Sequence, residues 1–188
     1  GSGTVYFVEQ MLHHAGRPTR GARVLVSGSG NVAQFAAAKA CDLGGKVLTF
    51  SDSDGTLYAR DGFDAEAIEQ GARVKAVRRG PLPELGEDAR FHSLPGRRPW
   101  HIPAEIALPC ATQNELDGED ARTLVKNGVV CVAEGANMPS TIEAVKVFEA
   151  NDVLYAPGKA SNAGGVATSG LEMSQNAARL VWTRDEVD

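Results

Sequence analysis

The chain has 188 residues, of which 43% are hydrophobic, and this size and composition are typical of one globular domain with a substantial core. The formal net charge of -5 argues against a general surface for nucleic acid or anionic membrane, because both partners require clustered positive charge. The three cysteines lack C-x-x-C spacing and no apolar run approaches the roughly 20 residues of a membrane span, so a reduced, cytoplasmic protein without zinc or disulfides is favoured.

The first elements follow one another as helix, strand and helix. Gly1-Ser2 resembles a cloning remnant, and we expect residues 3–188 to form a single domain. Apolar residues at helical spacing between Val5 and Ala15 predict a lead-in helix. Arg23–Ser27 is a short β-branched run, and the alanine-rich stretch Val32–Leu43 predicts a helix that ends at two glycines.

The same alternation continues to the end of the chain. Strands are predicted at 46–51, 106–108, 129–133 and 153–155, and helices at 65–79, 117–126, 141–150 and 163–182. The segment 80–103 is rich in Pro, Gly and Arg, and its pattern predicts no structure. Alternating strands and helices indicate βαβ units, so the predicted fold is an α/β, Rossmann-like, doubly wound and mostly parallel sheet with helices on both faces.

A glycine fingerprint lies between the first strand and its helix. Gly28-x-Gly30-x-x-Ala33 combines glycines that permit a tight turn with a helix N-terminus that favours an anion. A tight turn without a ligand is the alternative interpretation, but the strand, turn and helix context favours a dinucleotide. We therefore expect the backbone here to approach a pyrophosphate.

The residues after the second strand point to two different coenzymes. Asp52 stands where an acidic residue commonly binds the ribose 2′-hydroxyl of NAD. Lys75 and Arg78, three residues apart on a predicted helix, can instead present two cations to the 2′-phosphate of NADP beside Ser53. A turn-forming Asp52 and a solvated helix face are equally compatible with the pattern, so the spacing leaves the coenzyme open.

Three further loops follow predicted strands. Residues 109–115, 134–137 and 158–165 are rich in small and amide-bearing side chains, and ligands of open α/β sheets bind beyond the carboxyl ends of strands. Ordinary turns and helix caps explain each loop alone, but three in succession favour one shared crevice. The four histidines have no partner at ligand spacing, so no metal site is expected.

Four motifs in order resemble the hexameric, NADP-linked glutamate dehydrogenases. They are residues 26–34, 106–116, 132–139 and 162–176, and the likeness extends from about Gly3 to Asp188. The resemblance implies reversible conversion of glutamate to 2-oxoglutarate and ammonia with hydride transfer to NADP, a sheet with one reversed strand, and a homohexameric intact enzyme. Glu105, where the family usually has Asp, and Ser161, where it has Ala, are departures.

The resemblance also implies roles for individual residues. The pyrophosphate would lie at Ser29, Gly30, Asn31 and Val32, and the adenosine phosphate near Ser53, Lys75 and Arg78. The nicotinamide ribose or amide would lie near Ala111, Thr112, Gln113, Asn137 and Asn162, and Ser169 resembles a contact to the side-chain carboxylate of the substrate.

No catalytic residue is expected within this chain. In the family, the lysines and aspartate that bind glutamate and move protons lie in an N-terminal domain, and neither that domain nor the last C-terminal helices have a counterpart here. The 188 residues are expected to be monomeric and to bind a dinucleotide without turnover. An NAD-linked or dual-specificity amino-acid dehydrogenase domain and a stand-alone regulatory nucleotide-binding module remain alternatives.

Overall fold

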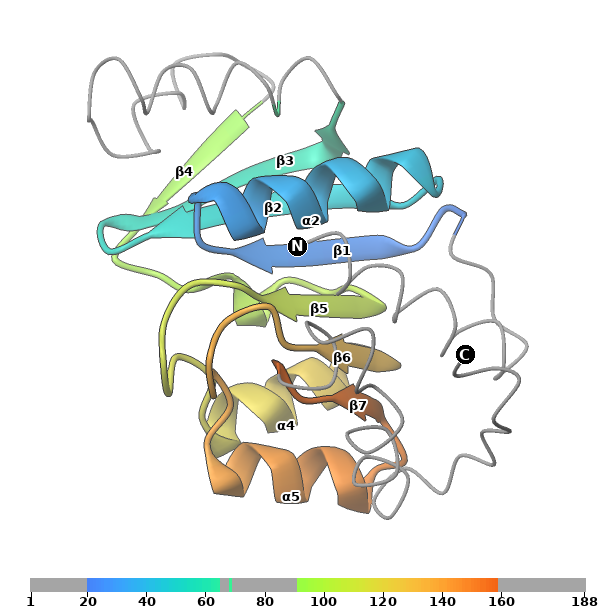
Figure 1. Cartoon of the computed structure of the whole chain (residues 1–188), viewed down its shortest axis with the longest axis vertical. Coiled ribbons are helices and arrows are strands. Elements are labelled where there is room, and N and C mark those ends of the chain that lie inside the picture. Colours follow the sequence, from blue (N-terminus) through green and yellow to red (C-terminus); the bar gives the residue numbers. More distant parts are fainter. Residues whose placement is uncertain (1–19, 65–67, 69–90, 159–188) are drawn as a thin grey trace.

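A twisted sheet forms the centre of the molecule in this computed structural model, which describes residues 20–64, 68 and 91–158. Within these residues the sheet has seven strands in the order β4-β3-β2-β1-β5-β6-β7. β3 runs antiparallel to β2 and β4, and the other neighbours are parallel (Figure 1). The strands are β1 (Arg23–Ser27), β2 (Lys46–Asp52), β3 (Gly55–Phe63), β4 (Phe91–Pro95), β5 (Ile106–Pro109), β6 (Cys131–Ala133) and β7 (Leu154–Ala156).

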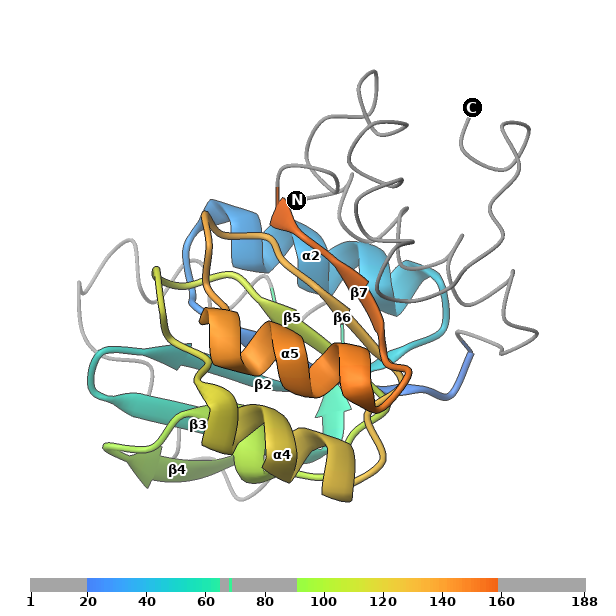
Figure 2. The same ribbon diagram turned by 90° about the horizontal axis from the view of Figure 1, so that it is seen from below.

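Helices cover both faces of this sheet. α2 (Asn31–Asp42) lies on one face, and α4 (Gly118–Lys126), α5 (Ile142–Ala150) and the 3₁₀ turn η2 (Pro99–His101) lie on the other (Figure 2). Successive side chains of β1 alternate between the two layers, so Val24 and Val26 join the core beneath α2 while Leu25 joins the core beneath α4 and α5. The doubly wound α/β fold predicted from the sequence is confirmed.

Small side chains let α2 lie close to the sheet. Four alanines at helical spacing are fully buried against it, and together they form the inner face of the helix: Ala33, Ala36, Ala37 and Ala40. On the other face, Trp100, Leu124 and Phe148 are fully buried, so larger side chains fill the second layer. Both layers hold the central strands rigidly, which fixes the loops at the strand ends.

Two strands were not predicted from the sequence. β3 contains Gly55 and Gly62, and β4 lies in the Pro, Gly and Arg-rich segment to which no structure was assigned. The other five strands were predicted, and their predicted bounds agree with the observed ones to within about two residues. The helices predicted near 32–43, 117–126 and 141–150 are likewise present, whereas those at 5–15, 65–79 and 163–182 fall outside the described residues, apart from Ile68.

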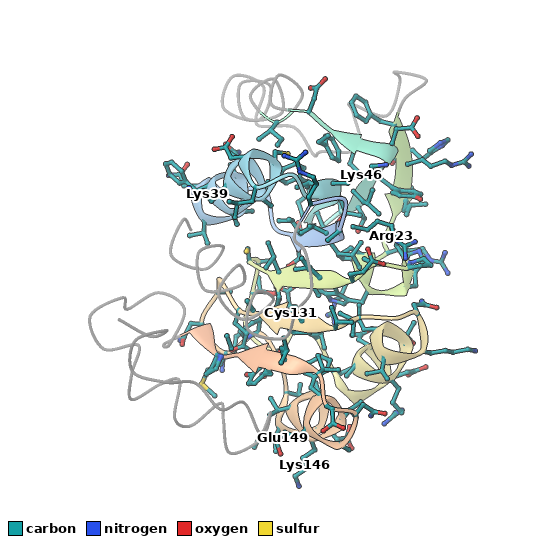
Figure 3. All side chains as sticks on the ribbon, turned by 90° about the vertical axis from the view of Figure 1, so that its right-hand side faces the viewer. Arg23, Lys39, Lys46, Cys131, Lys146 and Glu149 are labelled. Atoms are coloured by element: carbon teal, nitrogen blue, oxygen red, sulfur yellow. The ribbon has the colours of Figure 1, made fainter. Side chains whose placement is uncertain are left out.

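The parallel strands end at one edge of the sheet. Figure 3 looks at the opposite edge, where Arg23 begins β1 and Lys46 begins β2. Arg23 there pairs with Glu105 through a charged hydrogen bond of 2.5 Å between Nη2 and Oε2. The glutamate therefore supports this edge, and the described loops that carry predicted binding residues lie at the other one.

Candidate functional site

A cavity of about 720 Å³ lies at the carboxyl ends of β1, β2 and β5. Among the residues predicted to bind a dinucleotide, those that line it are residues 28–32, Asp52, Ser53, Ala111 and Thr112. The cavity is also lined by residues to which the sequence analysis gave no individual role, namely Ser51, Gly55, residues 96–98, Cys110 and Glu115. Cys110 and Glu115 belong to the loop 109–115 that was expected at a shared crevice. The site thus combines four loops that are distant in sequence.

Gly28 forms the turn that leaves β1. Its φ of +89° lies in the left-handed region, and a β-carbon would come within 2.8 Å of the Cys110 carbonyl oxygen. Any larger residue would therefore meet both backbone strain and a backbone clash. Glycine at this position lets the loops after β1 and β5 close on one another.

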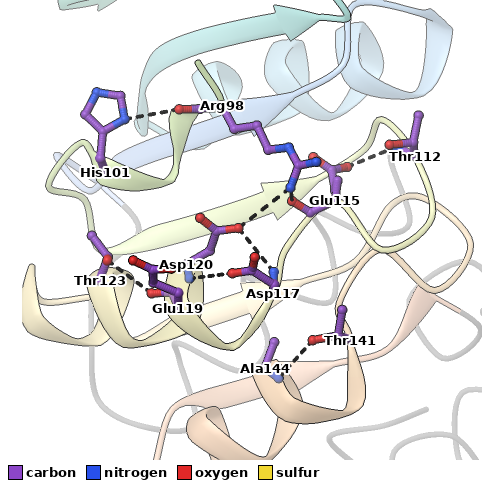
Figure 4. Close-up of polar contacts among 10 residues, drawn as sticks. All are labelled: Arg98, His101, Thr112, Glu115, Asp117, Glu119, Asp120, Thr123, Thr141 and Ala144. Carbon is purple, nitrogen blue, oxygen red and sulfur yellow. Dashed lines mark hydrogen bonds and ion pairs between the residues drawn. The ribbon is translucent and has the colours of Figure 1, made fainter. Parts of the chain in front are cut away.

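Gly30 has a different role, because it is the N-cap residue of α2 but has no side chain that could cap the helix. Its φ of -81° is ordinary, and a β-carbon there would meet no atom within 4 Å. The N-caps of α4 and α5, Asp117 and Thr141, each accept a hydrogen bond from a backbone N–H of their own helix (Figure 4). The N-cap of α2 makes no side-chain hydrogen bond. The first N–H groups of α2 therefore remain available to an anionic group in the cavity.

Hydrogen bonds hold the glycine turn in place. The Ser51 hydroxyl oxygen accepts from the Gly28 N–H at 3.0 Å, and the Ser51 N–H donates to the Gly28 carbonyl at 3.1 Å. The Gln34 side-chain amide donates to the Ser29 carbonyl at 2.7 Å. A backbone fixed in this way is preorganised to bind an anion without further ordering.

Asp52 at the end of β2 shapes its own turn. Its Oδ1 accepts hydrogen bonds from the backbone N–H groups of Asp54 (2.8 Å) and Gly55 (3.2 Å). This arrangement is an Asx turn, which corresponds to the turn-forming interpretation of Asp52. Ser53 beside it is exposed and lines the cavity.

Glu115 is a buried carboxylate in the wall of the cavity, with a relative exposure of 4%. Its Oε2 accepts from the N–H group of Ala111 at 2.9 Å and from that of Thr112 at 3.1 Å, and Figure 4 shows the contact with Thr112. Burial raises the pKa of Glu115, although hydrogen bonds from Ser27 and these two N–H groups act in the opposite direction. The carboxylate fixes the loop after β5 against the glycine turn.

Two arginines enter the cavity wall from the loop after β4. Arg98 donates from Nη1 to the Glu115 carbonyl oxygen at 2.5 Å, and the same nitrogen lies 3.8 Å from Oδ2 of Asp120 (Figure 4). Arg97 is exposed and lines the cavity. Their segment showed neither strand nor helix periodicity, so only the pairing of β4 with β3 reveals that they reach this site.

Two other predicted residues that the structure describes lie apart from this cavity. Gln113 and Asn137 are exposed on the loops after β5 and β6 and do not line it. These two loops are joined by a hydrogen bond from the Asn114 N–H to the Met138 carbonyl at 3.0 Å. The last four predicted residues lie outside the described part of the chain: Lys75, Arg78, Asn162 and Ser169.

Cysteine and metal chemistry find no support at the described residues. Cys41, Cys110 and Cys131 are free thiols, and burial raises the pKa of both Cys110 and Cys131 to about 12. No group of three metal-ligating side chains occurs in residues 20–64, 68 and 91–158. In the same ranges, no helix has the length and apolar character that a bilayer crossing requires.

The sequence of the chain matches a known protein family and several of its members. The family model of the glutamate/leucine/phenylalanine/valine dehydrogenases matches residues 1–188. The NADP-specific glutamate dehydrogenase of Escherichia coli K12 is 54% identical over 188 residues, which are 100% of this chain and 42% of that protein. The NAD(P)-specific glutamate dehydrogenase of Xylanibacter ruminicola is also 54% identical, with the same coverage. The chain thus spans less than half the length of these relatives.

Solved structures agree with the sequence comparisons. Glutamate dehydrogenase of Plasmodium falciparum superposes with a TM-score of 0.84 and 46% identity, and the match covers 100% of this chain and 40% of that one. The hetero-hexameric glutamate dehydrogenase of Thermus thermophilus superposes with a TM-score of 0.68 and 27% identity, covering 98% of this chain and 41% of that one.

Proposed function

The chain belongs to the glutamate/leucine/phenylalanine/valine dehydrogenase family, and on that premise we propose that it is the coenzyme-binding domain of an NADP-dependent glutamate dehydrogenase. The observation that carries the proposal is the uncapped N-terminus of α2, which follows a glycine turn and opens into a cavity at the carboxyl ends of the strands. The intact enzyme would interconvert glutamate with 2-oxoglutarate and ammonia.

The residues of the cavity fit a dinucleotide in two respects. The open space at Gly30 and the N–H groups of Asn31 and Val32 suit a pyrophosphate, because no side chain in the described part of the chain competes for these donors. Ala111 and Thr112 are small and are held by Glu115, so a flat ring can approach their backbone. The bound nicotinamide supplies the hydride chemistry, while the protein residues position it.

The hydrogen bonds of Asp52 favour NADP as the coenzyme. Oδ1 of Asp52 already accepts two backbone hydrogen bonds, so binding of a ribose hydroxyl there would compete with the turn. Lys75, Arg78 and Ser53 are proposed to bind the 2′-phosphate, as the resemblance implies. The NAD(P)-specific relative from Xylanibacter ruminicola supports a dual-specificity enzyme as the second candidate.

The family resemblance also implies which residues contact the substrate and how the intact enzyme assembles. We assign Ser169 to the side-chain carboxylate of glutamate, and Gln113, Asn137 and Asn162 to the nicotinamide end of the coenzyme. Proton transfer is assigned to residues of a separate substrate domain. The intact enzyme is proposed to be a cytoplasmic homohexamer and the 188-residue chain a monomer; a hexameric assembly is stated for the related enzyme from Thermus thermophilus.

The test is a separate calorimetric titration of the 188-residue chain with NADPH and with NADH. We expect NADPH to bind at least tenfold more tightly, which corresponds to about 1.4 kcal/mol. Equal affinities would favour the dual-specificity enzyme. Absence of binding to both coenzymes would refute the proposed function.

A further inference from the structure

We propose that Arg97 is a coenzyme-selecting residue, whose guanidinium contacts the 2′-phosphate on the adenosine ribose of NADPH. The inference rests on the proposed function, which places the adenosine end of the coenzyme beside Ser53. Neither the family motifs nor the sequence patterns single out Arg97. Its assignment depends on how β4 and the turn after it pack against the end of β2.

Backbone hydrogen bonds fix the turn that carries Arg97 beside the turn that carries Ser53. The Gly96 N–H donates to the Asp54 carbonyl at 2.8 Å, and the Thr56 hydroxyl donates to the Arg97 carbonyl at 2.5 Å. Gly55 lies in register with Pro95, and a β-carbon on Gly55 would come within 2.5 Å of the Leu94 carbonyl oxygen. The two turns therefore cannot separate without breaking the β3–β4 pairing.

The position of β4 in the sheet also determines which end of the coenzyme Arg97 would contact. The strand order places β4 two positions beyond β2, and the chain after β4 returns along the carboxyl edge toward η2. Residues 96–98 consequently line the cavity together with Asp52 and Ser53, which follow β2. A phosphate held by Ser53 would have Arg97 on the wall beside it.

Arg97 and Arg98 differ in the partners of their guanidinium groups. The guanidinium of Arg98 is engaged by the Glu115 carbonyl and lies near Asp120, so it anchors the segment (Figure 4). Arg97 makes no ion pair with any residue in the described ranges, and its side chain is exposed at the cavity. A guanidinium without a carboxylate partner can donate two hydrogen bonds to a phosphate.

Phosphate fits this position better than the ribose hydroxyls of NADH. A neutral hydroxyl gains little from a nearby cation, whereas a dianionic phosphate forms charge-assisted hydrogen bonds that are roughly twice as strong as neutral ones. Arg97 would therefore act on NADPH selectively. Its contribution would add to the one that the family resemblance implies for Lys75 and Arg78.

The experiment compares Arg97→Gln with a matched control in the 188-residue chain. Arg60→Gln removes the same charge from an exposed position on β3. Arg60 is five residues from Gly55, a cavity residue, and therefore lies about 16 Å from it along the strand. Dissociation constants for NADPH and NADH are measured for both variants and the wild type at low and high salt. Arg97→Lys tests whether the charge alone is sufficient.

We expect Arg97→Gln to weaken NADPH binding about tenfold, which corresponds to about 1.4 kcal/mol, and to weaken NADH binding less than about twofold. The salt dependence of NADPH binding should become shallower, and Arg97→Lys should restore part of the affinity. Arg60→Gln should leave the NADPH to NADH ratio unchanged.

Two outcomes would overturn the inference while leaving the proposed function intact. Unchanged dissociation constants for both coenzymes in Arg97→Gln would show a solvated arginine. Equal losses for both coenzymes would place Arg97 at the pyrophosphate, which the two coenzymes share. If the wild-type chain binds neither coenzyme, the proposed function itself fails, and this result is distinguishable from both.

Discussion

Gly28 and Cys110 approach so closely that a β-carbon on Gly28 would come within 2.8 Å of the Cys110 carbonyl oxygen. Two residues later, a β-carbon on Gly30 would meet nothing within 4 Å. The first glycine is therefore required by the fold, because the loops after β1 and β5 close upon it. The second leaves space at the start of α2, where a ligand can approach.

This difference predicts opposite outcomes for two substitutions. Gly30→Val should fill the open space and abolish dinucleotide binding, while the melting temperature changes little. Gly28→Ala should destabilise the fold by more than about 1 kcal/mol, because alanine disfavours the left-handed conformation and would also meet Cys110. Calorimetry and thermal denaturation measure both effects. Unchanged coenzyme affinity in a folded Gly30→Val variant would remove this turn from the phosphate site.

Glu115 should make stability depend on pH. Burial raises its pKa above the ordinary value of 4.5, so the native state holds the proton over an interval in which the unfolded state has lost it. Its contribution to stability is present below the unfolded pKa and is lost as pH rises through the folded pKa. Glu115→Gln mimics the protonated side chain and should gain stability relative to the wild type as pH rises from acidic to neutral.

Denaturant titrations across this pH range provide the measurement for Glu115. Glu119→Gln is the control, because Glu119 is exposed on α4 and the substitution removes an equal charge. Its stability should follow the wild type at each pH. Parallel pH profiles for Glu115→Gln and the wild type would contradict the raised pKa.

Asp52 should oppose NADPH binding rather than support NADH binding. Asp52→Asn keeps an oxygen that can accept from the N–H groups of Asp54 and Gly55, but it removes a negative charge beside the proposed 2′-phosphate. NADPH should then bind several-fold more tightly, and NADH affinity should change little. A selective loss of NADH affinity would instead identify Asp52 as a ribose ligand of NAD.

Lys75 and Arg78 carry the sequence-based prediction for coenzyme choice. Charge-assisted hydrogen bonds contribute roughly 1.5–3 kcal/mol each, so replacing both residues with alanine should weaken NADPH binding strongly and leave NADH binding nearly unchanged. The salt dependence of NADPH affinity should flatten as well. Small, equal losses for both coenzymes would indicate a solvated helix face, and the NAD-linked alternative would then be preferred.

The 188-residue chain should bind coenzyme without oxidising glutamate. Positioning of the substrate and proton transfer are assigned to another domain, and a bound nicotinamide has no reaction partner without them. Reduction of NADP in the presence of glutamate should therefore stay at background in a purified preparation that binds NADPH stoichiometrically. Turnover near the rate of an intact glutamate dehydrogenase would refute this assignment.

Local sequence patterns determined the layered fold because each element carries its own signal. The apolar run of β1 specifies a strand that is buried on both faces, and the alanines of α2 specify one buried face of that helix. Asp117 and Thr141 mark the starts of their helices. The glycine turn was also recognisable, because positive φ and close backbone approach require glycine whatever lies around it. Strand, turn and helix were thus predictable without tertiary contacts.

Only the tertiary structure decided which residues face the cavity. β3 and β4 have weak strand patterns, with Gly55, Gly62 and Pro95 among their residues, and they are defined by pairing with β2 and with one another. That pairing brings Arg97 next to the end of β2. Burial, in turn, gives Glu115 its raised pKa. Sequence alone specified the glycine loop that is proposed to receive a phosphate, whereas long-range packing selected the charges around it, because strand pairing and desolvation depend on residues far apart in the chain.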